Sequence, residues 1–344
     1  MIKNPVQKAG KYLLIGDLCM DVFMQVSEYP PEGGDGSVKR IRQHAGGSAA
    51  NTAMALAKIG GKPVLLTHTG SDNWAKQLLP ILESVGVNTS RIVREEHEPT
   101  GLTFLVVSEA AERTMFTYRG ANSCLHPDEI TSDLLAGVEM LHISAYACLK
   151  APQSEAVLKA VDFASKYQVG ISLDVGVEPA HQARELLLQL LPKLTLIILG
   201  EAEARVITNT ESVDEAITSL LGSGVQMIGL KLGKHGCRLV TKEQDLVIPG
   251  FVIDAIDTTG AGDSFCAGII HGLTHRWGLE MTGRFANALG ALAATRWGAG
   301  EELPTKNEIT KFLSERNSFE SDPVILQILN QLNASNENNK DTYE

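Results

Sequence analysis

A run of small residues that ends in an acid is the part of this sequence best suited to chemistry. It reads Asp257-Thr-Thr-Gly-Ala-Gly-Asp263 and leads into an apolar helix, and Gly260, Ala261 and Gly262 let their backbone amides converge on one point. Amides at a helix N-terminus favour a bound anion, because they lack partners within the helix and lie at the positive end of its dipole. A carboxylate there would repel a phosphate, unless it takes a proton from a hydroxyl that attacks the phosphate. The pattern therefore predicts a small-molecule kinase with Asp263 as its base.

Asp263 also has a purely structural explanation, since aspartate often caps a helix N-terminus. The neighbouring residues favour the catalytic explanation. Thr258 and Thr259 place hydroxyl groups beside the path of the phosphate, and small residues continue at Ala267-Gly268. Asp257, at the start of the run, is expected to hold a cation or to brace the loop.

A second glycine-rich segment, Gly46-Gly47-Ser-Ala-Ala-Asn51, opens another helix. Its glycines let a ligand reach the main chain, and Asn51 offers both a donor and an acceptor. Asp17 and Asp21 follow the first predicted strand, at the carboxyl edge where open α/β sheets bind ligands. Carboxylates suit a polyhydroxylated substrate. The alternatives are close packing of helix on sheet for the glycines and ordinary turn chemistry for Asp17.

A glycine turn follows a later apolar strand, and it reads Lys231-Leu-Gly233-Lys-His-Gly236. It is typical either of one wall of a nucleotide pocket or of a plain hairpin. The sequence has no Gly-x-Gly-x-x-Gly after the first strand and no Gly-x4-Gly-Lys-Ser/Thr, which disfavours a dinucleotide oxidoreductase and a P-loop NTPase. The nine histidines lack metal-ligand spacing, so a zinc site is not expected.

The elements that must position these residues alternate between strand and helix. Repeated units of this kind predict a parallel sheet with helices on both faces. Two segments depart from this pattern, residues 22–44 and 100–119, where alternating apolar residues stand between turns and predict antiparallel ribbons that pair into one small sheet. The predicted core elements are strands 12–15, 63–67, 140–144, 169–174, 194–199 and 226–232, helices 49–60, 74–85, 154–167, 180–191 and 202–208, and a hairpin of 237–240 with 245–248.

Bulk composition limits the partners and the location. The chain has 344 residues, 44% of them hydrophobic, and a net charge of −11, which argues against nucleic acid as a partner. Five scattered cysteines without a CxxC pair are typical of reduced thiols in a cytosol. We find no signal peptide and no apolar stretch of roughly 20 residues that would span a membrane, so we expect a cytoplasmic protein. The polar tail after Ala334 is expected to be disordered.

Taken together, these residues closely resemble the ribokinase-like (PfkB-type) carbohydrate kinase family over about residues 11–315. The first family signature matches Gly46 to Asn51, and the second matches Asp257 to Asp263. The resemblance implies an α/β three-layer sandwich with a mostly parallel central sheet and a small β-sheet lid. The core would comprise residues 1–21, 45–99 and 120–333, the lid residues 22–44 and 100–119, and the tail residues 334–344. It also implies transfer of the ATP γ-phosphoryl group to a substrate hydroxyl.

By the same resemblance, each part of the reaction has its residues. Asp263 would be the base, and the amides of Gly260, Ala261 and Gly262 would form an anion hole. The remaining roles are a sugar site at Asp21, Gly46, Gly47 and Asn51, a nucleotide site at Lys231, Gly233, Gly236 and Asn287, magnesium held through water by Glu203, and a monovalent cation such as K⁺ at Asp257 with the stretch 296–300. From their positions in the motifs, we add Asp17 to the sugar site and Thr258 to the nucleotide site.

The sequence departs from the family pattern at two positions. The family usually has Asn-x-x-Glu before its magnesium site, whereas this chain reads Gly200-Glu-Ala-Glu203, so we expect weaker magnesium handling rather than inactivity. Cys19 stands where ribokinases tend to have a polar amide in the sugar pocket, which makes ribose itself a less favoured substrate.

Two other functions stay open. A nucleoside kinase on the same scaffold would need an aromatic floor for the base, for which the lid offers Phe104, Phe116 and Tyr118. A sugar-sensing protein without catalysis would account for Gly200, although the intact Asp263 argues against it. A homodimer through the lid is also expected, because exposed sheet edges pair with copies of themselves.

Overall fold

The computed structural model describes residues 11–109, 113–320 and 322–337, and its centre is a large, mostly parallel sheet. In the described part of the chain this sheet has nine strands, of which only the hairpin strands β12 and β13 run antiparallel to their neighbours. In their order across the sheet, the strands are β13 (Asp245–Ile248), β12 (Cys237–Val240), β11 (Met227–Lys231), β10 (Leu196–Gly200), β9 (Gly170–Asp174), β8 (Met140–Ser144), β1 (Lys11–Ile15), β4 (Lys62–Gly70) and β5 (Ile92–Glu95).

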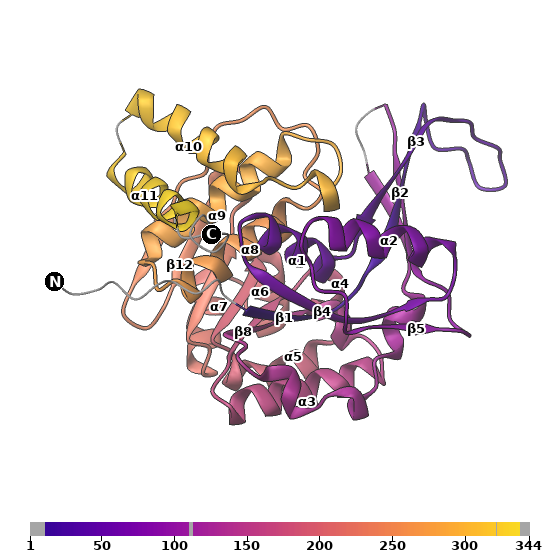
Figure 1. Cartoon of the computed structure of the whole chain (residues 1–344), viewed down its shortest axis with the longest axis horizontal. Helices are drawn as coiled ribbons and strands as arrows, with labels where there is room; N and C mark the ends of the chain where they lie inside the picture. The colour runs from indigo at the N-terminus through magenta and orange to yellow at the C-terminus, as the bar shows by residue number, and fades with distance from the viewer. Residues whose placement is uncertain (1–10, 110–112, 321, 338–344) are drawn as a thin grey trace.

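Helices cover both faces of the sheet (Figure 1). One face carries α1 (Ser48–Lys58), α2 (Asn73–Ser84), α8 (Ala261–Thr274), α9 (Leu279–Ala294), α10 (Lys306–Glu320) and α11 (Pro323–Glu337). The other face carries α3 (Gln153–Lys166), α4 (Val177–Gln182), α5 (Arg184–Leu190), α6 (Glu201–Thr208) and α7 (Val213–Gly222). Short 3-10 helices connect them, namely η1 (Gly120–Cys124), η2 (Pro127–Glu129), η3 (Ser132–Leu135), η4 (Ala145–Cys148), η5 (Leu191–Lys193), η6 (Gly233–His235) and η7 (Gly300–Glu302).

Strand β1 shows why this sheet holds two cores. Its side chains point alternately to the two faces, so Tyr12 and Leu14 join one hydrophobic cluster while Leu13 and Ile15 join the other. All four are buried. A strand covered on both faces is a nearly continuous apolar run, which is the pattern of residues 12–15. The predicted three-layer α/β fold is confirmed.

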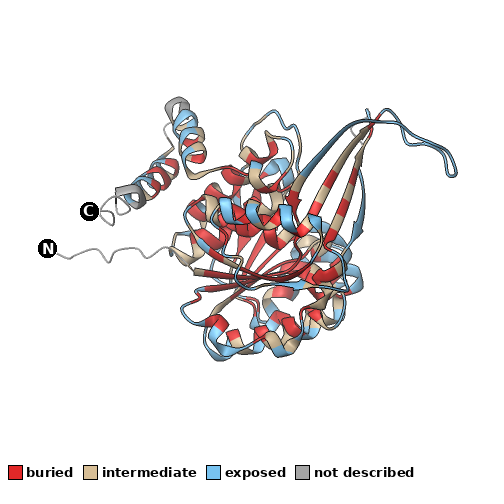
Figure 2. Cartoon of the chain, turned by 45° about the vertical axis from the view of Figure 1, so that its right-hand side comes forward, coloured by how far each residue is buried: buried red, intermediate tan, exposed pale blue. Residues whose placement is uncertain are grey.

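Four further strands form a second, smaller sheet, which we call the lid. Its order is β3 (Val38–Gly46), β2 (Cys19–Val26), β6 (Gly101–Val107) and β7 (Arg113–Tyr118). The pairs β2–β3 and β6–β7 are antiparallel and β2–β6 is parallel, so the prediction that the two ribbons pair is confirmed. The lid projects from the core and is largely exposed at its far end (Figure 2). Strand β2 already begins at Cys19 and β3 continues to Gly46, beyond the expected 22–44.

The structure differs from the sequence prediction in two helical segments. The single helix expected over 180–191 is divided at Ala183, where ψ is 14° and α4 ends before α5 begins. Helix α11 continues past Ala334 to Glu337, and its residues Ile325 and Ile328 are buried against the core. Residues 338–344 of the expected tail lie outside the described residues. Within the described ranges, no helix is both long and apolar enough to cross a bilayer.

Candidate active site

Two glycines shape the N-terminus of helix α8, and each is needed for a different reason. Gly260 caps the helix with φ 74°, and a Cβ there would lie 2.8 Å from the Cβ of Ala299, so a larger residue does not fit. At Gly262 a Cβ would meet nothing within 4 Å, so the main chain of the first helical turn faces open space. The Ala261 N–H donates to the Thr258 carbonyl at 3.2 Å. The loop therefore presents bare backbone at the positive end of a helix.

Asp263 lies in this first turn and receives two hydrogen bonds from helix α1. Ser48 Oγ donates to Oδ1 at 2.9 Å, and Asn51 Nδ2 donates to Oδ2 at 2.9 Å. The carbonyl oxygen of Asn51 accepts from the Gly300 N–H at 3.2 Å. The two glycine-rich segments found in the sequence thus meet at one carboxylate. Ser48 was not singled out from the sequence, although it lies within the second segment.

The surroundings of Asp263 change its acidity. Burial raises the pKa of this half-buried carboxyl to about 6, and the nearby charge of Asp174 acts in the same direction. The hydrogen bonds from Asn51 and Ser48 and the charge of Lys231 oppose this rise. A carboxylate with a pKa near 6 is ionised at neutral pH but is a stronger base than an exposed aspartate.

Lys231, at the end of β11, is held by Asp174, at the end of β9. Its Nζ donates to Asp174 Oδ1 at 2.8 Å. Burial by itself would lower the pKa of Lys231, but the charge of Asp174 and that of Glu203 raise it, so the ammonium stays protonated. The sequence placed Lys231 in a nucleotide pocket but did not identify its partner Asp174.

The expected sugar-site residues lie together where β2, β3 and α1 meet. A Cβ at Gly46 would overlap the Asp21 carboxyl at 2.1 Å, so these two residues are in direct contact. Gly47 has φ 94°, and a Cβ there would lie 2.3 Å from the Asp17 carbonyl oxygen. Both glycines are therefore required by close packing as well as by any ligand. Asn51 lies one helical turn further on, against Asp263.

Asp17 differs from the other predicted sugar ligands because both of its oxygens have a strong partner. Arg119 donates from Nε to Oδ2 at 2.8 Å and from NH2 to Oδ1 at 2.6 Å. NH2 of Arg119 also donates to Gln153 Oε1 at 2.6 Å. Burial would lower the pKa of Arg119, but Asp17 raises it. This bidentate pair joins the residue after the last lid strand to the core, and sequence reasoning did not predict it.

The register of the lid strands decides which side chains share a face with Asp21. Asp21 stands opposite Thr103, which stands opposite Thr117, whereas Val22 stands opposite Phe104, which stands opposite Phe116. Side chains directly opposite one another lie on the same face. We call the face with Asp21 the inner face and the face with Val22 the outer face.

The aromatic residues considered as a floor for a nucleobase lie on the outer face. Phe104 and Phe116 share it with Val22, and Tyr118 shares it with Met20 through Leu102. They are therefore separated from Asp21 by the sheet. On the inner face, Phe23 makes an edge-to-face contact with Trp297, with ring centroids 5.4 Å apart. Cys19 is buried, and its Sγ lies 3.5 Å from Asn122 Nδ2.

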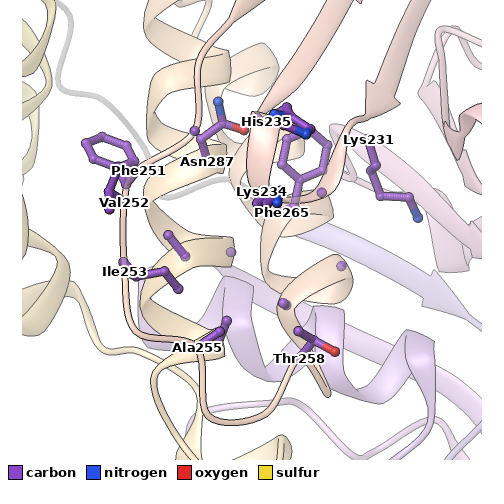
Figure 3. A pocket seen from close by; sticks show the side chains of 18 residues that line it. Lys231, Lys234, His235, Phe251, Val252, Ile253, Ala255, Thr258, Phe265 and Asn287 are labelled. Carbon is purple, nitrogen blue, oxygen red and sulfur yellow. The ribbon is translucent and has the colours of Figure 1, made fainter.

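A cavity of about 600 Å³ lies beside the α8 N-terminus. Its lining includes all five residues expected at a nucleotide site, namely Lys231, Gly233, Gly236, Thr258 and Asn287, together with Gly262. Figure 3 shows Val252, Ile253 and Ala255 along one wall, with Lys231 and Thr258 on the opposite side. Sequence reasoning did not predict this wall. The apolar residues that follow the predicted hairpin of 237–240 and 245–248 could have indicated it, because no strand was expected there. Val252 is 91% exposed.

Asn287 shapes this cavity through the main chain. Its Nδ2 donates to the carbonyls of Ile248 and Pro249 at 3.0 and 3.1 Å. These bonds fix the point at which strand β13 ends and the wall of residues 250–255 begins. Asn287 lies on α9 together with Gly290, and both residues line the cavity.

The two residues expected to hold metals both bond to nearby main chain. Glu203 Oε2 accepts from the Gly200 N–H at 2.7 Å and so caps helix α6. Glu203 also lies close enough to Lys231 to raise its pKa. Asp257 Oδ1 accepts from the N–H and hydroxyl of Thr259, and Oδ2 accepts from the Gly298 N–H at 2.9 Å. Asp257 therefore braces its loop.

Comparisons with known proteins identify the family of this chain. Residues 10–306 match the pfkB family carbohydrate kinases. A probable fructokinase-2 of Arabidopsis thaliana is 30% identical over 283 residues, which cover 78% of this chain and 86% of that protein. A ribokinase of Haemophilus influenzae is 28% identical over 305 residues, which cover 87% of this chain and 97% of that protein.

Solved structures agree on the fold. A putative ribokinase II from E. coli, in complex with ATP and Mg²⁺, superposes with a TM-score of 0.80 at 22% identity, covering 89% of this chain and 99% of that one. The chain therefore belongs to the pfkB family of carbohydrate kinases, phosphotransferases whose acceptor is an alcohol group.

Proposed function

We propose that this protein transfers the γ-phosphoryl group of ATP to a hydroxyl of a small sugar, with Asp263 as the general base. The observation that carries the proposal is the position of the Asp263 carboxylate, in the first turn of α8 and hydrogen-bonded to Ser48 and Asn51 at 2.9 Å. Its chain neighbours Ala261 and Gly262 line the cavity, and its partners Ser48 and Asn51 belong to the helix that follows Gly46 and Gly47. A hydroxyl placed there would lose its proton to Asp263 while it attacks the phosphate.

ATP would occupy the cavity of about 600 Å³, with its phosphates at the α8 N-terminus. The amides of Gly260 and Gly262 would receive the transferred phosphoryl oxygens, and that of Ala261 would exchange its 3.2 Å bond to Thr258 for one to the phosphate. Lys231 supplies a positive charge on the cavity wall, which Asp174 holds in place.

The residues near Lys231 fit a magnesium ion held through water. Glu203 uses one carboxylate oxygen to cap α6, and the second is left for a water ligand of the metal. Bound magnesium would neutralise charge on the phosphate oxygens. Because Gly200 brings no side-chain ligand, we propose that this site handles magnesium more weakly than its relatives.

The sugar would lie under the inner face of the lid. Asp21 would accept hydrogen bonds from neighbouring sugar hydroxyls, and the main chain at Gly46 and Gly47 would allow close contact. Asp17 would act through Arg119, because both of its oxygens are occupied by that guanidinium. Closure of the lid would exclude water from the phosphoryl group.

The names of the relatives suggest which acceptors to test. They include probable fructokinases, ribokinases and deoxyribokinases, so D-fructose, D-ribose and 2-deoxy-D-ribose form the first panel. Adenosine tests the nucleoside alternative, for which the inner-face aromatic pair of Phe23 and Trp297 would have to provide the base contact. We expect a free sugar to be the better acceptor.

The decisive experiment replaces the base. Asp263→Asn should lower kcat by about 10²- to 10⁴-fold, the usual contribution of a general base. Calorimetry should still detect ATP and sugar binding. Asp254→Asn, an exposed acid in the adjoining segment, is the control and should keep normal turnover. Near-normal turnover of Asp263→Asn would refute the proposal. Sugar binding without ATP consumption in the unaltered protein would instead identify a sugar sensor.

We also propose that a second copy of the chain covers the outer face of the lid. Ile41 and Phe116 on this face are 59% and 61% exposed, and Tyr118 is 50% exposed. Exposed apolar side chains on one face of a sheet favour self-association. Sedimentation should show a dimer that Phe116→Lys converts to a monomer, and a monomeric unaltered protein would contradict the dimer. The cytoplasmic location stays a prediction.

The last of these proposals is a monovalent cation such as K⁺ at Asp257. Three donors already bond to the carboxylate, which leaves limited acceptor capacity for a cation. Exchange of K⁺ for tetramethylammonium should lower kcat if the cation belongs to the loop. Equal rates in both salts would show that no cation is needed, and that Asp257 only stabilises its loop.

A further inference from the structure

The loop after helix α9, residues 296–302, packs directly against lid strand β3. Glu301 Oε2 accepts from the Ala45 N–H at 3.3 Å, and Glu301 Oε1 lies 3.4 Å from His44 Nδ1. The two main chains also touch. A Cβ at Gly298 would lie 3.0 Å from the His44 ring, and one at Gly300 would lie 2.4 Å from the Ala45 carbonyl oxygen. No side chain separates the loop from the base of the lid at these points.

On its other side, the same loop holds the phosphate-binding turn. The Gly298 N–H donates to Asp257, which in turn accepts from Thr259. Ala299 is the residue against which Gly260 packs, at 2.8 Å from the position of its missing Cβ. The turn from Asp257 to Gly260, which leads into the proposed phosphate-binding amides, is thus supported by loop residues.

The same loop is also connected to the proposed base, Asp263, through hydrogen bonds of Asn51. The Gly300 N–H donates to Asn51 Oδ1 at 3.2 Å, and Asn51 Nδ2 donates to Asp263 at 2.9 Å. A shift of Gly300 would therefore move Asn51, and with it one of the two hydrogen bonds that orient the Asp263 carboxylate.

A second lid contact lies next to the first. Trp297 meets Phe23 edge to face, at an interplanar angle of 76°. Phe23 shares the inner face with Asp21, because the two are separated by two positions along β2. Trp297 is 43% exposed, so its indole lies at the edge of the site where lid and core meet.

We propose that Glu301 is a positioning residue, through which the lid aligns the phosphate-binding turn and the base when a sugar binds. The inference rests on the proposed phosphoryl transfer and extends it to the control of that step. The lid carries Asp21 and the end of β3, so a sugar bound under the lid would move His44 and Ala45. Glu301 would transmit this movement to Gly298 and Gly300.

The test compares Glu301→Gln and His44→Gln with Glu302→Gln, which removes a neighbouring charge in the same loop. The best sugar of the acceptor panel is the probe, with ATP and magnesium. We expect Glu301→Gln and His44→Gln to raise KM for the sugar and lower kcat, roughly fivefold in all, while KM for ATP stays unchanged. The double variant should be no worse than Glu301→Gln, because both changes break one contact. Glu302→Gln should behave as the unaltered protein.

The comparison of the two Michaelis constants separates this role from a purely structural one, because a general loss of structure would also raise KM for ATP. Effects that add in the double variant, or an unchanged KM for the sugar in Glu301→Gln, would overturn the proposal. The assignment of Asp263 would remain intact, since it rests on the loss of kcat in Asp263→Asn.

Binding can be followed without turnover. The chain has three tryptophans, Trp74, Trp277 and Trp297, and only Trp297 touches the lid among the aromatic contacts of the described residues. Sugar should change the fluorescence of the unaltered protein, and Trp297→Phe should abolish that change. An unchanged signal in Trp297→Phe would show that lid movement does not reach this loop.

Discussion

Asn51 donates a 2.9 Å hydrogen bond to Asp263 across 212 residues of sequence, and its carbonyl oxygen accepts one from Gly300. One amide side chain therefore connects the proposed base to the other glycine-rich segment and to the loop below the lid. Because Asn51 donates to the ionised form of Asp263, it also limits how far burial can raise the pKa of that carboxyl.

The pH dependence of catalysis should report this bond. Asp263 must be ionised to accept a proton, so kcat/KM should rise with pH through about 6. Asn51→Leu removes a hydrogen bond to the charged form, which should move this acid limb upward by about one pH unit. Ser48→Ala should shift the limb in the same direction. An acid limb that stays near 6 in both variants would contradict the assignment of Asp263.

Substitution of the two glycines at the α8 N-terminus should have different effects, one on stability and the other on activity. Gly260→Ala puts a Cβ into Ala299 at a positive φ and should cost about 2–4 kcal/mol of unfolding free energy. Gly262→Ala meets no atom and should be stable, even gaining up to about 1 kcal/mol from helix propensity. It should nevertheless lose at least about tenfold in kcat/KM, because its methyl group enters the phosphate site. Urea denaturation and steady-state kinetics measure the two effects, and an active Gly262→Ala would argue against an anion hole there.

The ion pair of Asp17 and Arg119 should contribute to the stability of the fold as well as to the site. Their side chains are only 8% and 16% exposed, so Arg119→Met would leave a buried carboxylate without a partner. Such losses cost about 3–5 kcal/mol. Asp17→Asn combined with Arg119→Met should recover much of this loss, since it removes the uncompensated charge. Urea denaturation of the three variants tests this, and a double variant less stable than Arg119→Met would refute it.

Replacement of Gly200 by asparagine should strengthen magnesium binding. Gly200 has extended dihedral angles, and a Cβ there would lie 3.7 Å from Glu203, which is an ordinary contact. Gly200→Asn should therefore fit and add a few tenths of a kcal/mol as a better helix cap. It should also lower the magnesium concentration needed for half-maximal rate. Gly200→Ala fills the same space without an amide and should leave the magnesium requirement unchanged, so equal behaviour of both variants would show that the amide is not a ligand.

Much of the fold could be predicted because its signals are local. The apolar run of residues 12–15 indicates a strand buried on both faces, and the glycines around Asp263 indicate a tight turn into a helix. The break at Ala183 was missed because the apolar pattern continues across it. The prediction that Phe104 and Phe116 could contact a nucleobase was wrong, because both lie on the outer face of the lid. Alternation in the sequence defines the two faces of a strand, but it does not show which face turns towards the site.

By itself, the sequence determined the order of strands and helices and the two glycine-rich segments, and it pointed to Asp263 as the proposed base, since each depends on residues close together in the chain. Only the tertiary structure decided which charges are paired. Asp17 and Arg119 are 102 residues apart, and Asp174 and Lys231 are 57 apart. Their contacts, and the raised pKa of Asp263, arise from strand order and burial, because electrostatic energy depends on distance in space and on exclusion of water.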